Sequence, residues 1–380
     1  MKYLLMIPGP VESPDEVIDA FNGQTIAHYG DEFRDLYIDT VDRLSRILGS
    51  KGLSFLIPGS GTTALEAIGA TFCNGKSCLV INNGSFGDRI YDVSTRYSAN
   101  TDQVLFKRGE VFDLEKIKSQ IKSKKYDLLW MVHVDTSVGI LNPVKEATAI
   151  AKEQGCLVFV DAIASSGIEE IRMDEWHIDG VATASQKGFE CPAGLGMITI
   201  NEQLIKSLDD LPPSRSWYCD LRIWYDYYNK WNDWHPYPVT LPTNTVKALA
   251  KGLEMIENNG ISNKLAMHKN ASARLIKAIK SLGLGLFIPE EDMAHGLTAV
   301  STLGKFEAPE FVEFLKNKFK IQIGGSLINE IKPTVFRIGH MSTKQCLTRN
   351  LVSIITALGI FMREKNINVN LDKALSSLIS

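Results

Sequence analysis

The sequence predicts an α/β fold with a mostly parallel central sheet, helices on both faces of that sheet, and a smaller C-terminal α+β domain. Short β-rich runs alternate with helical stretches from about residue 15 to about residue 200, an order typical of a parallel sheet covered by helices. Several runs are almost entirely apolar, as strands buried on both faces should be. From about Asn259 the order changes to helix, strands and helix, which predicts the second domain.

The expected strands of the large sheet are short and rich in β-branched or aliphatic residues. They lie at Leu53–Ile57, Ser77–Ile81, Leu128–Val134, Leu157–Val160, Gly180–Ala184 and Met197–Ile200. The helices expected between them include Thr62–Phe72 and Val144–Lys152. The smaller domain is expected to contain a helix over Lys264–Ser281, strands around Leu297–Val300 and Lys320–Ile323, and a final helix from Cys346. We therefore expect a large domain over residues 15–258 and a small domain over residues 259–380 that also takes in residues 1–14.

Composition limits the class of protein. The 380 residues are enough for two domains, and 44% hydrophobic with 22% charged residues is ordinary globular composition. With 41 Lys+Arg against 44 Asp+Glu, the chain lacks the basic character of a nucleic-acid binder. No apolar run reaches the roughly 18 residues of a membrane span, and the start MKYLLMIPGPVES meets Pro-Gly-Pro too early for a signal peptide. We expect a cytoplasmic protein with neither nucleic acid nor membrane as a partner.

The cysteines and histidines give no sign of a disulfide framework or a metal site. Six cysteines without a CxxC pair in so long a chain indicate reduced thiols. The seven histidines include no HxxxH pair, so the sequence does not support a metal centre.

A glycine-rich loop, Gly59–Ala64, follows one predicted strand and opens a helix. Free backbone amides at a helix N-terminus bind anions, usually phosphate. The loop also fits the GxGxxA pattern of dinucleotide folds, but that fold needs an acidic residue about 20 positions further on. Here the next strand ends in Asn82-Asn83-Gly84. The pattern favours a phosphate monoester at Ser60, Gly61 and Thr62, and an NAD(P)-dependent dehydrogenase stays as the alternative from a different class.

A carboxylate and an amine follow consecutive strands. Asp161 lies at the end of the strand segment CLVFVDA, one residue before Ala162, and Lys187 ends GVATASQK. In doubly wound sheets the carboxyl ends of strands hold the ligand. This pair suits pyridoxal 5'-phosphate, in which a lysine forms a Schiff base and an acid keeps the pyridine nitrogen protonated. Phe86 and Thr136 each follow another strand and could supply an aromatic face and a hydrogen bond to the ring hydroxyl.

Seven segments together carry a resemblance over nearly the whole chain. They are PGPVE, PGSGTTALEA, NNGSFGDRI, HVDTSVGILNP, VFVDAIAS, SQKGFECPAGLG and FRIGH. In these segments the chain resembles the class V aminotransferases of fold type I, and in particular the alanine or serine–glyoxylate (pyruvate), 2-aminoethylphosphonate–pyruvate and pyridoxamine–pyruvate aminotransferases.

The resemblance implies a role for each candidate. Lys187 would form the Schiff base and shuttle the proton, and Asp161 would pair with the pyridine nitrogen. Phe86 would stack on the ring, where the family commonly has Trp or Tyr, and Thr136 would contact the ring oxygen. The phosphate would be held by Ser60, Gly61, Thr62 and Gln186.

Substrate residues are also implied by the resemblance. Arg337 in TVFRIGHMS matches the arginine that clasps the substrate carboxylate, and a planar guanidinium suits bidentate carboxylate recognition. It alternates with Phe336 and Ile338, so its side chain is expected on the opposite face of a strand. Gly9 and Tyr29 match positions near the substrate. The family often shows GHR where this chain has AHY at 27–29, a departure that leaves the amino donor open.

The segment from Ser216 to Tyr237 holds four of the six tryptophans and five of the eleven tyrosines, a density typical of a core helix or a large interface. In the resembled family the following YxxT motif, here Tyr237 and Thr240, reaches across a dimer interface to the neighbour's phosphate. We therefore expect a homodimer with shared sites.

These observations predict a pyridoxal phosphate-dependent transaminase that works by a ping-pong mechanism. It would move an amino group from a small amine or amino acid to pyruvate or glyoxylate, with the alanine/serine–glyoxylate type favoured. The alternatives are a 2-aminoethylphosphonate–pyruvate or pyridoxamine–pyruvate aminotransferase, and then a cysteine desulfurase or lyase. A non-catalytic carrier of the cofactor is a further alternative.

Overall fold

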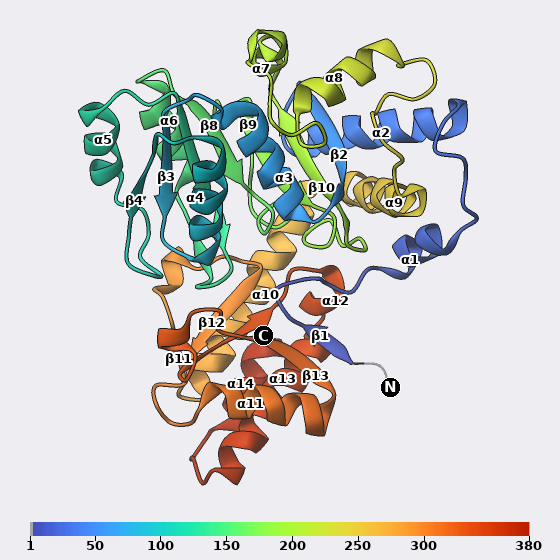
Figure 1. Cartoon of the computed structure of the whole chain (residues 1–380). Coiled ribbons are helices and arrows are strands. Elements are labelled where there is room, and N and C mark those ends of the chain that lie inside the picture. Colours follow the sequence, from blue (N-terminus) through green and yellow to red (C-terminus); the bar gives the residue numbers. More distant parts are fainter. Residues whose placement is uncertain (1–2, 380) are drawn as a thin grey trace.

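The large sheet of the computed structural model, which describes residues 3–379, has seven strands (Figure 1). Their order across the sheet is β2 (Leu53–Gly59), β10 (Gly194–Ile200), β9 (Gly180–Ala184), β8 (Leu157–Asp161), β5 (Leu128–Val132), β3 (Cys78–Asn82) and β4 (Thr101–Leu105). The five strands from β9 to β4 are parallel, and β10 runs antiparallel to both β9 and β2. The predicted mostly parallel sheet is confirmed.

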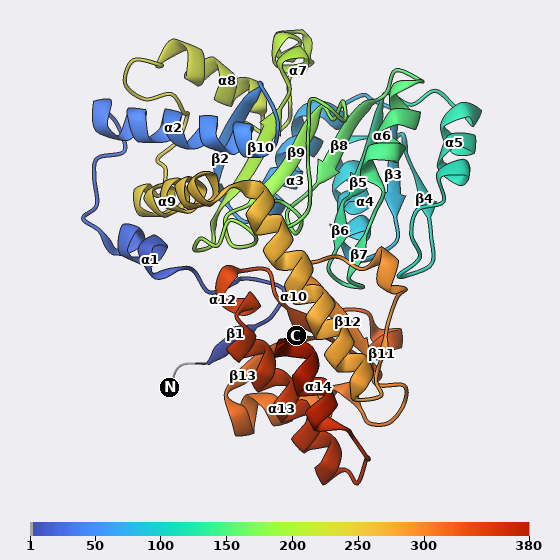
Figure 2. The same ribbon diagram turned by 180° about the vertical axis from the view of Figure 1, so that it is seen from behind.

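Helices cover both faces of this sheet because its central strands are apolar throughout. Every residue of β3, β5 and β9 is buried. The helices α3 (Gly61–Ile68) and α4 (Ser85–Tyr97) lie in front of the sheet in Figure 1, whereas α6 (Val144–Lys152) and α9 (Thr243–Asn259) lie in front in the reverse view of Figure 2. The remaining helices of this part are α2 (Asp31–Ile47), α5 (Leu114–Ser123), α7 (Glu202–Lys206) and α8 (Leu221–Lys230).

Most predicted elements begin and end within three residues of their expected bounds, and two of them are interrupted in the structure. The helix over Val144–Lys152 matches residue for residue. The helix expected over Thr62–Phe72 is α3 followed by a π-helical turn over Gly69–Cys73. The strand expected to reach Val134 ends at Val132, since Val134–Asp135 (β6) pairs instead with Ile140–Leu141 (β7) in a separate hairpin.

The smaller sheet has five strands. Their order is β1 (Leu4–Met6), β13 (Ile321–Gly325), β14 (Val335–Gly339), β12 (Leu297–Ser301) and β11 (Gly285–Leu286). The longer helices that accompany it are α10 (Ile261–Ser281), α11 (Ala308–Phe314), α13 (Thr348–Glu364) and α14 (Leu371–Ile379). The final helix expected from Cys346 is divided into α12 (Thr343–Cys346) and α13, because Leu347 is extended (φ −60°, ψ 131°).

Two segments connect the parts of the molecule. The long helix α10 runs from the large sheet to the small one (Figure 2). At the other end of the chain, β1 pairs in parallel with β13 of the small sheet, and the chain then continues to α1 (Asp15–Asn22), which packs on α9. The stretch from Ile7 to Pro14 therefore passes between the two parts. Among residues 3–379, no helix combines the length and apolar character needed to cross a bilayer.

Candidate functional site

The candidate residues gather where strands of the large sheet end. Asp161 is the last residue of β8, and Lys187 lies in the turn that follows β9. These strands are parallel neighbours, with Asp161 opposite Ala182, so both side chains leave the sheet at the same edge. The sequence predicted this juxtaposition.

Lys187 is held against the N-terminal segment. Its Nζ donates a hydrogen bond to the Pro8 carbonyl. The pKa of Lys187 is lowered to about 8, mainly by burial and to a smaller extent by the positive charge of Arg337, whereas the charge of Asp161 acts in the opposite direction. A lysine whose pKa lies near neutrality has a larger share of free amine, the form that attacks a carbonyl.

Gly9 is the residue that allows this contact. A Cβ at Gly9 would lie 2.5 Å from Lys187 Cδ and 2.8 Å from both Cε and Nζ. The φ angle of Gly9 is +90°, a backbone conformation that favours glycine. Gly9 therefore packs directly on the side chain of Lys187. Its contact with a substrate stays a prediction.

Asp161 is a buried carboxyl, 3% exposed. Burial raises the pKa of Asp161 to about 7, and the nearby carboxylate of Asp135 adds to the shift. The Ile163 amide, which donates to Oδ1 at 3.0 Å, opposes it, as do the charges of Arg89 and Lys187. A cationic ring nitrogen beside this carboxyl would favour its ionised form.

The N-terminus of α3 lies beside Asp161. Ser60 is the N-cap residue, and its side chain makes no capping hydrogen bond. A Cβ at Gly61 would lie 2.6 Å from Ile163 Cδ1, so glycine lets the helix approach the segment that follows Asp161. The hydroxyl of Thr62 accepts a hydrogen bond from Arg89 at 3.4 Å. Backbone amides, hydroxyls and a guanidinium together suit a phosphate group.

Asp135, a carboxylate that the sequence did not single out, holds the backbone of Phe86 and lies directly before Thr136 in the chain. Asp135 is fully buried and accepts hydrogen bonds from the amides of Phe86 (2.9 Å), Gly87 (3.3 Å) and Ser137 (3.0 Å). It thereby joins the first turn of α4 to the β6 hairpin. The guanidinium of Arg89 lies 4.9 Å from the centre of the Phe86 ring and covers one face, so a stacked ligand would use the other.

Gln186 precedes Lys187 and carries a buried polar atom without a partner. Its side-chain Oε1 has no hydrogen bond, whereas its main-chain carbonyl accepts from the amide of Val11 at 3.1 Å. Since rotation exchanges the two ends of a glutamine amide, this side chain could donate to an anion. An unsatisfied buried polar group is costly, and a bound polar group would satisfy it.

Arg337 reaches the site from the small sheet. It lies on β14 and is 6% exposed. Its Nε and Nη2 donate to the Gly325 carbonyl at 2.9 and 2.6 Å, and Nη1 donates to the Thr136 carbonyl at 2.6 Å. Burial lowers the pKa of Arg337 to about 10, and Asp135 opposes this. The guanidinium thus uses three of its five N–H donors to bind both parts of the molecule. Its positive charge also lowers the pKa of Lys187.

Three candidates lie elsewhere. Tyr29 is 53% exposed and contacts His28 and Trp234. Tyr237 is fully buried within its own chain, where its hydroxyl donates to the His28 carbonyl. The expectation that Tyr237 and Thr240 reach a neighbouring site stays a prediction. Thr240 is exposed.

The gathered groups have the chemistry that pyridoxal phosphate needs. The cofactor requires an amine for its aldehyde, an acid for its ring nitrogen, an anion site for its phosphate and a flat apolar surface for its ring. Lys187, Asp161, the N-terminus of α3 and the free face of Phe86 meet these requirements. The residues fit the cofactor. The side-chain amide of Gln186, whose Oε1 has no hydrogen-bond partner, is consistent with one further polar contact to it.

Comparison with known proteins extends these findings. The family model described as Aminotransferase class-V matches residues 14–328. An uncharacterized aminotransferase of Methanocaldococcus jannaschii is 30% identical over 376 residues, which cover 97% of this chain and 95% of that protein. Alanine–glyoxylate aminotransferase 1 of Saccharomyces cerevisiae is 28% identical, covering 90% and 92%. The crystal structure of ureidoglycine–glyoxylate aminotransferase from Bacillus subtilis has a TM-score of 0.93 at 26% identity, covering 100% of this chain and 97% of that one.

Proposed function

Because the chain belongs to the class V aminotransferases, we propose that it transfers an amino group from a small amine or amino acid to pyruvate or glyoxylate, with pyridoxal 5'-phosphate bound at the Lys187–Asp161 site. The observation that carries the proposal is the convergence of three groups: Asp161 and Lys187 follow neighbouring parallel strands of the large sheet, and Arg337 of the small sheet donates to the Thr136 carbonyl. The dehydrogenase alternative is wrong, because the family match assigns the chain to another class of enzyme.

Each side chain of the site has a separate role in the proposed reaction. When bound, the cofactor supplies an electron sink for the carbon that loses a proton. The amine of Lys187, with its pKa lowered by burial, takes that proton from the donor carbon and returns it to the neighbouring position. Asp161 would keep the pyridine nitrogen protonated. Phe86 would stack on the ring, and Thr136 would donate a hydrogen bond to the ring oxygen.

Arg337 selects the substrate. Its guanidinium binds the carboxylate of a 2-oxo acid and points the carbonyl carbon toward Lys187. A buried arginine favours a compact anion, which supports pyruvate or glyoxylate as the acceptor. The anion would compete for donors that now bind Gly325 and Thr136.

The amino donor is proposed to be alanine or serine. Relatives of this chain are named as alanine–glyoxylate aminotransferases, which supports alanine, and serine rests on the sequence resemblance alone. 2-Aminoethylphosphonate and pyridoxamine are the alternatives. A desulfurase is less suited, since burial raises the pKa of the Cys346 thiol to about 12 and leaves it without thiolate at neutral pH.

We also propose a cytoplasmic homodimer. All six cysteines are free thiols, which suits a reducing compartment. Thr240 is exposed and available to a second chain, whereas Tyr237 would have to leave its buried position to contact the neighbour's phosphate.

The test is spectroscopic. Purified protein and Lys187→Ala are mixed with pyridoxal phosphate and their visible absorption is recorded, followed by titration with L-alanine, L-serine, 2-aminoethylphosphonate or pyridoxamine. We expect a visible band in the wild type, altered in Lys187→Ala and bleached by one amine. A wild-type protein without a band after addition of the cofactor would refute the proposal.

A further inference from the structure

A buried carboxylate, Glu190, closes the turn that carries Lys187. The Glu190 amide donates to the Lys187 carbonyl at 2.9 Å, so the two residues form the ends of one tight turn. Glu190 has a φ of +58°, an uncommon conformation for a residue with a side chain. The surrounding contacts therefore hold this turn in a defined shape.

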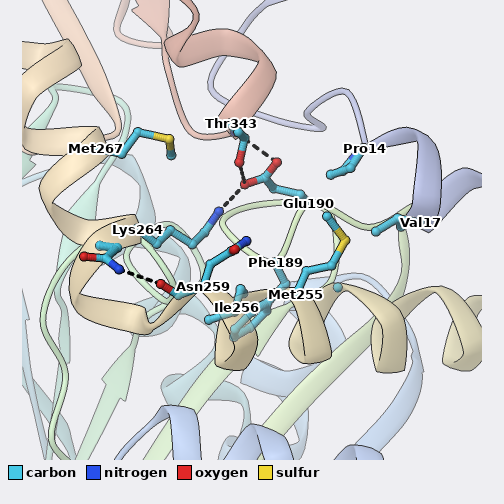
Figure 3. A pocket seen from close by; sticks show the side chains of 12 residues that line it. Pro14, Val17, Phe189, Glu190, Met255, Ile256, Asn259, Lys264, Met267 and Thr343 are labelled. Atoms are coloured by element: carbon cyan, nitrogen blue, oxygen red, sulfur yellow. Dashed lines mark hydrogen bonds and ion pairs between the residues drawn. The ribbon is translucent and has the colours of Figure 1, made fainter.

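The partners of Glu190 lie on two other elements (Figure 3). Its Oε1 forms an ion pair with Lys264 of α10 and accepts from the Thr343 hydroxyl at 2.9 Å. Its Oε2 accepts from the Thr343 amide at 2.9 Å. The side chains of Glu190 and Lys264 are only 4% and 8% exposed. The turn that carries Lys187 is thus bonded to helix α10 through Lys264 and to the first residue of α12 through Thr343.

The helix α12 also holds the other two elements of the site. It follows β14, the strand of Arg337, after three residues. Its Gln345 side chain donates to the carbonyls of Leu5 (2.9 Å) and Ile7 (3.0 Å). These carbonyls lead directly to Pro8, which accepts the hydrogen bond from Lys187. One short helix therefore contacts the lysine turn and the segment against the lysine, and three residues join it to the strand of the arginine.

The surroundings of the ion pair suggest a role beyond packing. A cavity of about 320 Å³ lies beside it, lined by apolar groups such as Met255, Ile256 and Met267 together with Glu190 and Lys264. A buried ion pair adds little net stability when compared with apolar residues that fill the same space. Glu190 and Lys264 lie at the wall of this cavity, so apolar side chains do not fill the space beside them. The ion pair also joins two parts of the molecule that have separate hydrophobic cores.

We propose that Glu190 is a positioning residue that fixes Lys187 relative to Arg337 through Lys264 and Thr343. A 2-oxo acid must contact both ends of this arrangement, with its carboxylate at Arg337 and its carbonyl carbon beside Lys187. Glu190 fixes the distance between the Lys187 amine and the Arg337 guanidinium. The inference rests on the proposed aminotransferase function and adds a residue that touches neither substrate nor cofactor.

The first test compares two acceptors. Glu190→Gln and Thr343→Val are loaded with pyridoxamine phosphate and mixed with pyruvate or with acetaldehyde, which lacks the carboxylate, while the returning visible band is followed. Since a displacement of about 1 Å at a reacting centre can cost about 100-fold, we expect Glu190→Gln to lower the pyruvate rate about tenfold and the acetaldehyde rate by less than about twofold. Thr343→Val keeps the amide contact and should show a smaller loss of the same kind.

The matched control is Asp179→Asn. Asp179 is also a buried carboxylate, paired with Lys152 and bound to the Val158 amide, but it precedes β9 at the end of the strand opposite Lys187. It should leave the ratio of the two rates unchanged. Equal losses with both acceptors in Glu190→Gln, or no loss in either, would overturn the inference. A wild type that returns no band would instead refute the proposed function.

The second test needs no cofactor. Hydrogen exchange of cofactor-free protein is measured for peptides that cover residues 186–191 and 340–346. We expect exchange to accelerate in both segments together in Glu190→Gln, and in neither segment in Asp179→Asn. Unchanged exchange in the lysine turn would show that Glu190 does not hold it and would contradict the inference.

Discussion

Replacement of Gly9 by alanine tests the packing of the N-terminal segment on Lys187. The added methyl would lie 2.5 Å from Lys187 Cδ and 2.8 Å from Cε and Nζ, whereas carbon atoms in contact are normally about 3.5–4.0 Å apart. The lysine must therefore retreat by about 1 Å, which can cost about 100-fold in rate. That factor corresponds to about 2.7 kcal/mol of lost transition-state stabilisation.

The assay is the initial rate of transamination with pyruvate, measured as kcat/KM beside the visible absorption of the bound cofactor. Gly75→Ala is the matched control, because Gly75 has a φ of +71° and nothing lies within 4 Å of an added Cβ. Gly75 therefore also has a positive φ, but it lacks the contact. If Gly9→Ala retained a kcat/KM within about threefold of Gly75→Ala, the reasoning from this contact would be refuted, since a 1 Å displacement should cost far more.

Three further predictions follow from the site. Arg337→Lys loses the planar fork and should raise the KM for pyruvate at least about tenfold, whereas an unchanged KM would remove Arg337 from carboxylate binding. Asp135→Ala leaves buried amides, including that of Phe86, without an acceptor and should lower the free energy of unfolding by about 3 kcal/mol, measured in urea. The pKa of Asp161 in the cofactor-free protein is raised from 3.8 to about 7, so between these values the native state keeps a proton that the unfolded state has released. The free energy of unfolding should therefore fall as the pH rises from about 4 to about 7, and Asp161→Asn should flatten this slope. A slope that persists in Asp161→Asn would assign it to another group.

The sequence predicts those features of the fold that depend on local pattern. Apolar runs identify the buried strands, and the helix over Val144–Lys152 follows from its periodicity alone. The positions of Asp161 and Lys187 after consecutive strands predict that they meet, because parallel strands end at a common edge. The divided C-terminal helix was not predicted, since Leu347 interrupts it without a glycine or proline to mark the break.

Contacts between distant segments could not be predicted from pattern. Asp135 appears in HVDTSVG as one more polar residue, and only the folded chain brings the amides of Phe86 and Gly87 to it. Arg89 lies in the NNGSFGDRI segment, one helical turn after Phe86, and this spacing could have predicted the contact between the two side chains. The burial of Tyr237 against the His28 carbonyl likewise depends on residues about 200 positions away.

Chemical trapping identifies the lysine that binds the cofactor. Protein incubated with pyridoxal phosphate is reduced with borohydride, digested and mapped by mass spectrometry. We expect one modified peptide that contains Lys187, and no modification of that peptide in Lys187→Ala. Cofactor fixed on a different lysine, with Lys187 unmodified, would refute the assignment of Lys187 as the cofactor-binding lysine.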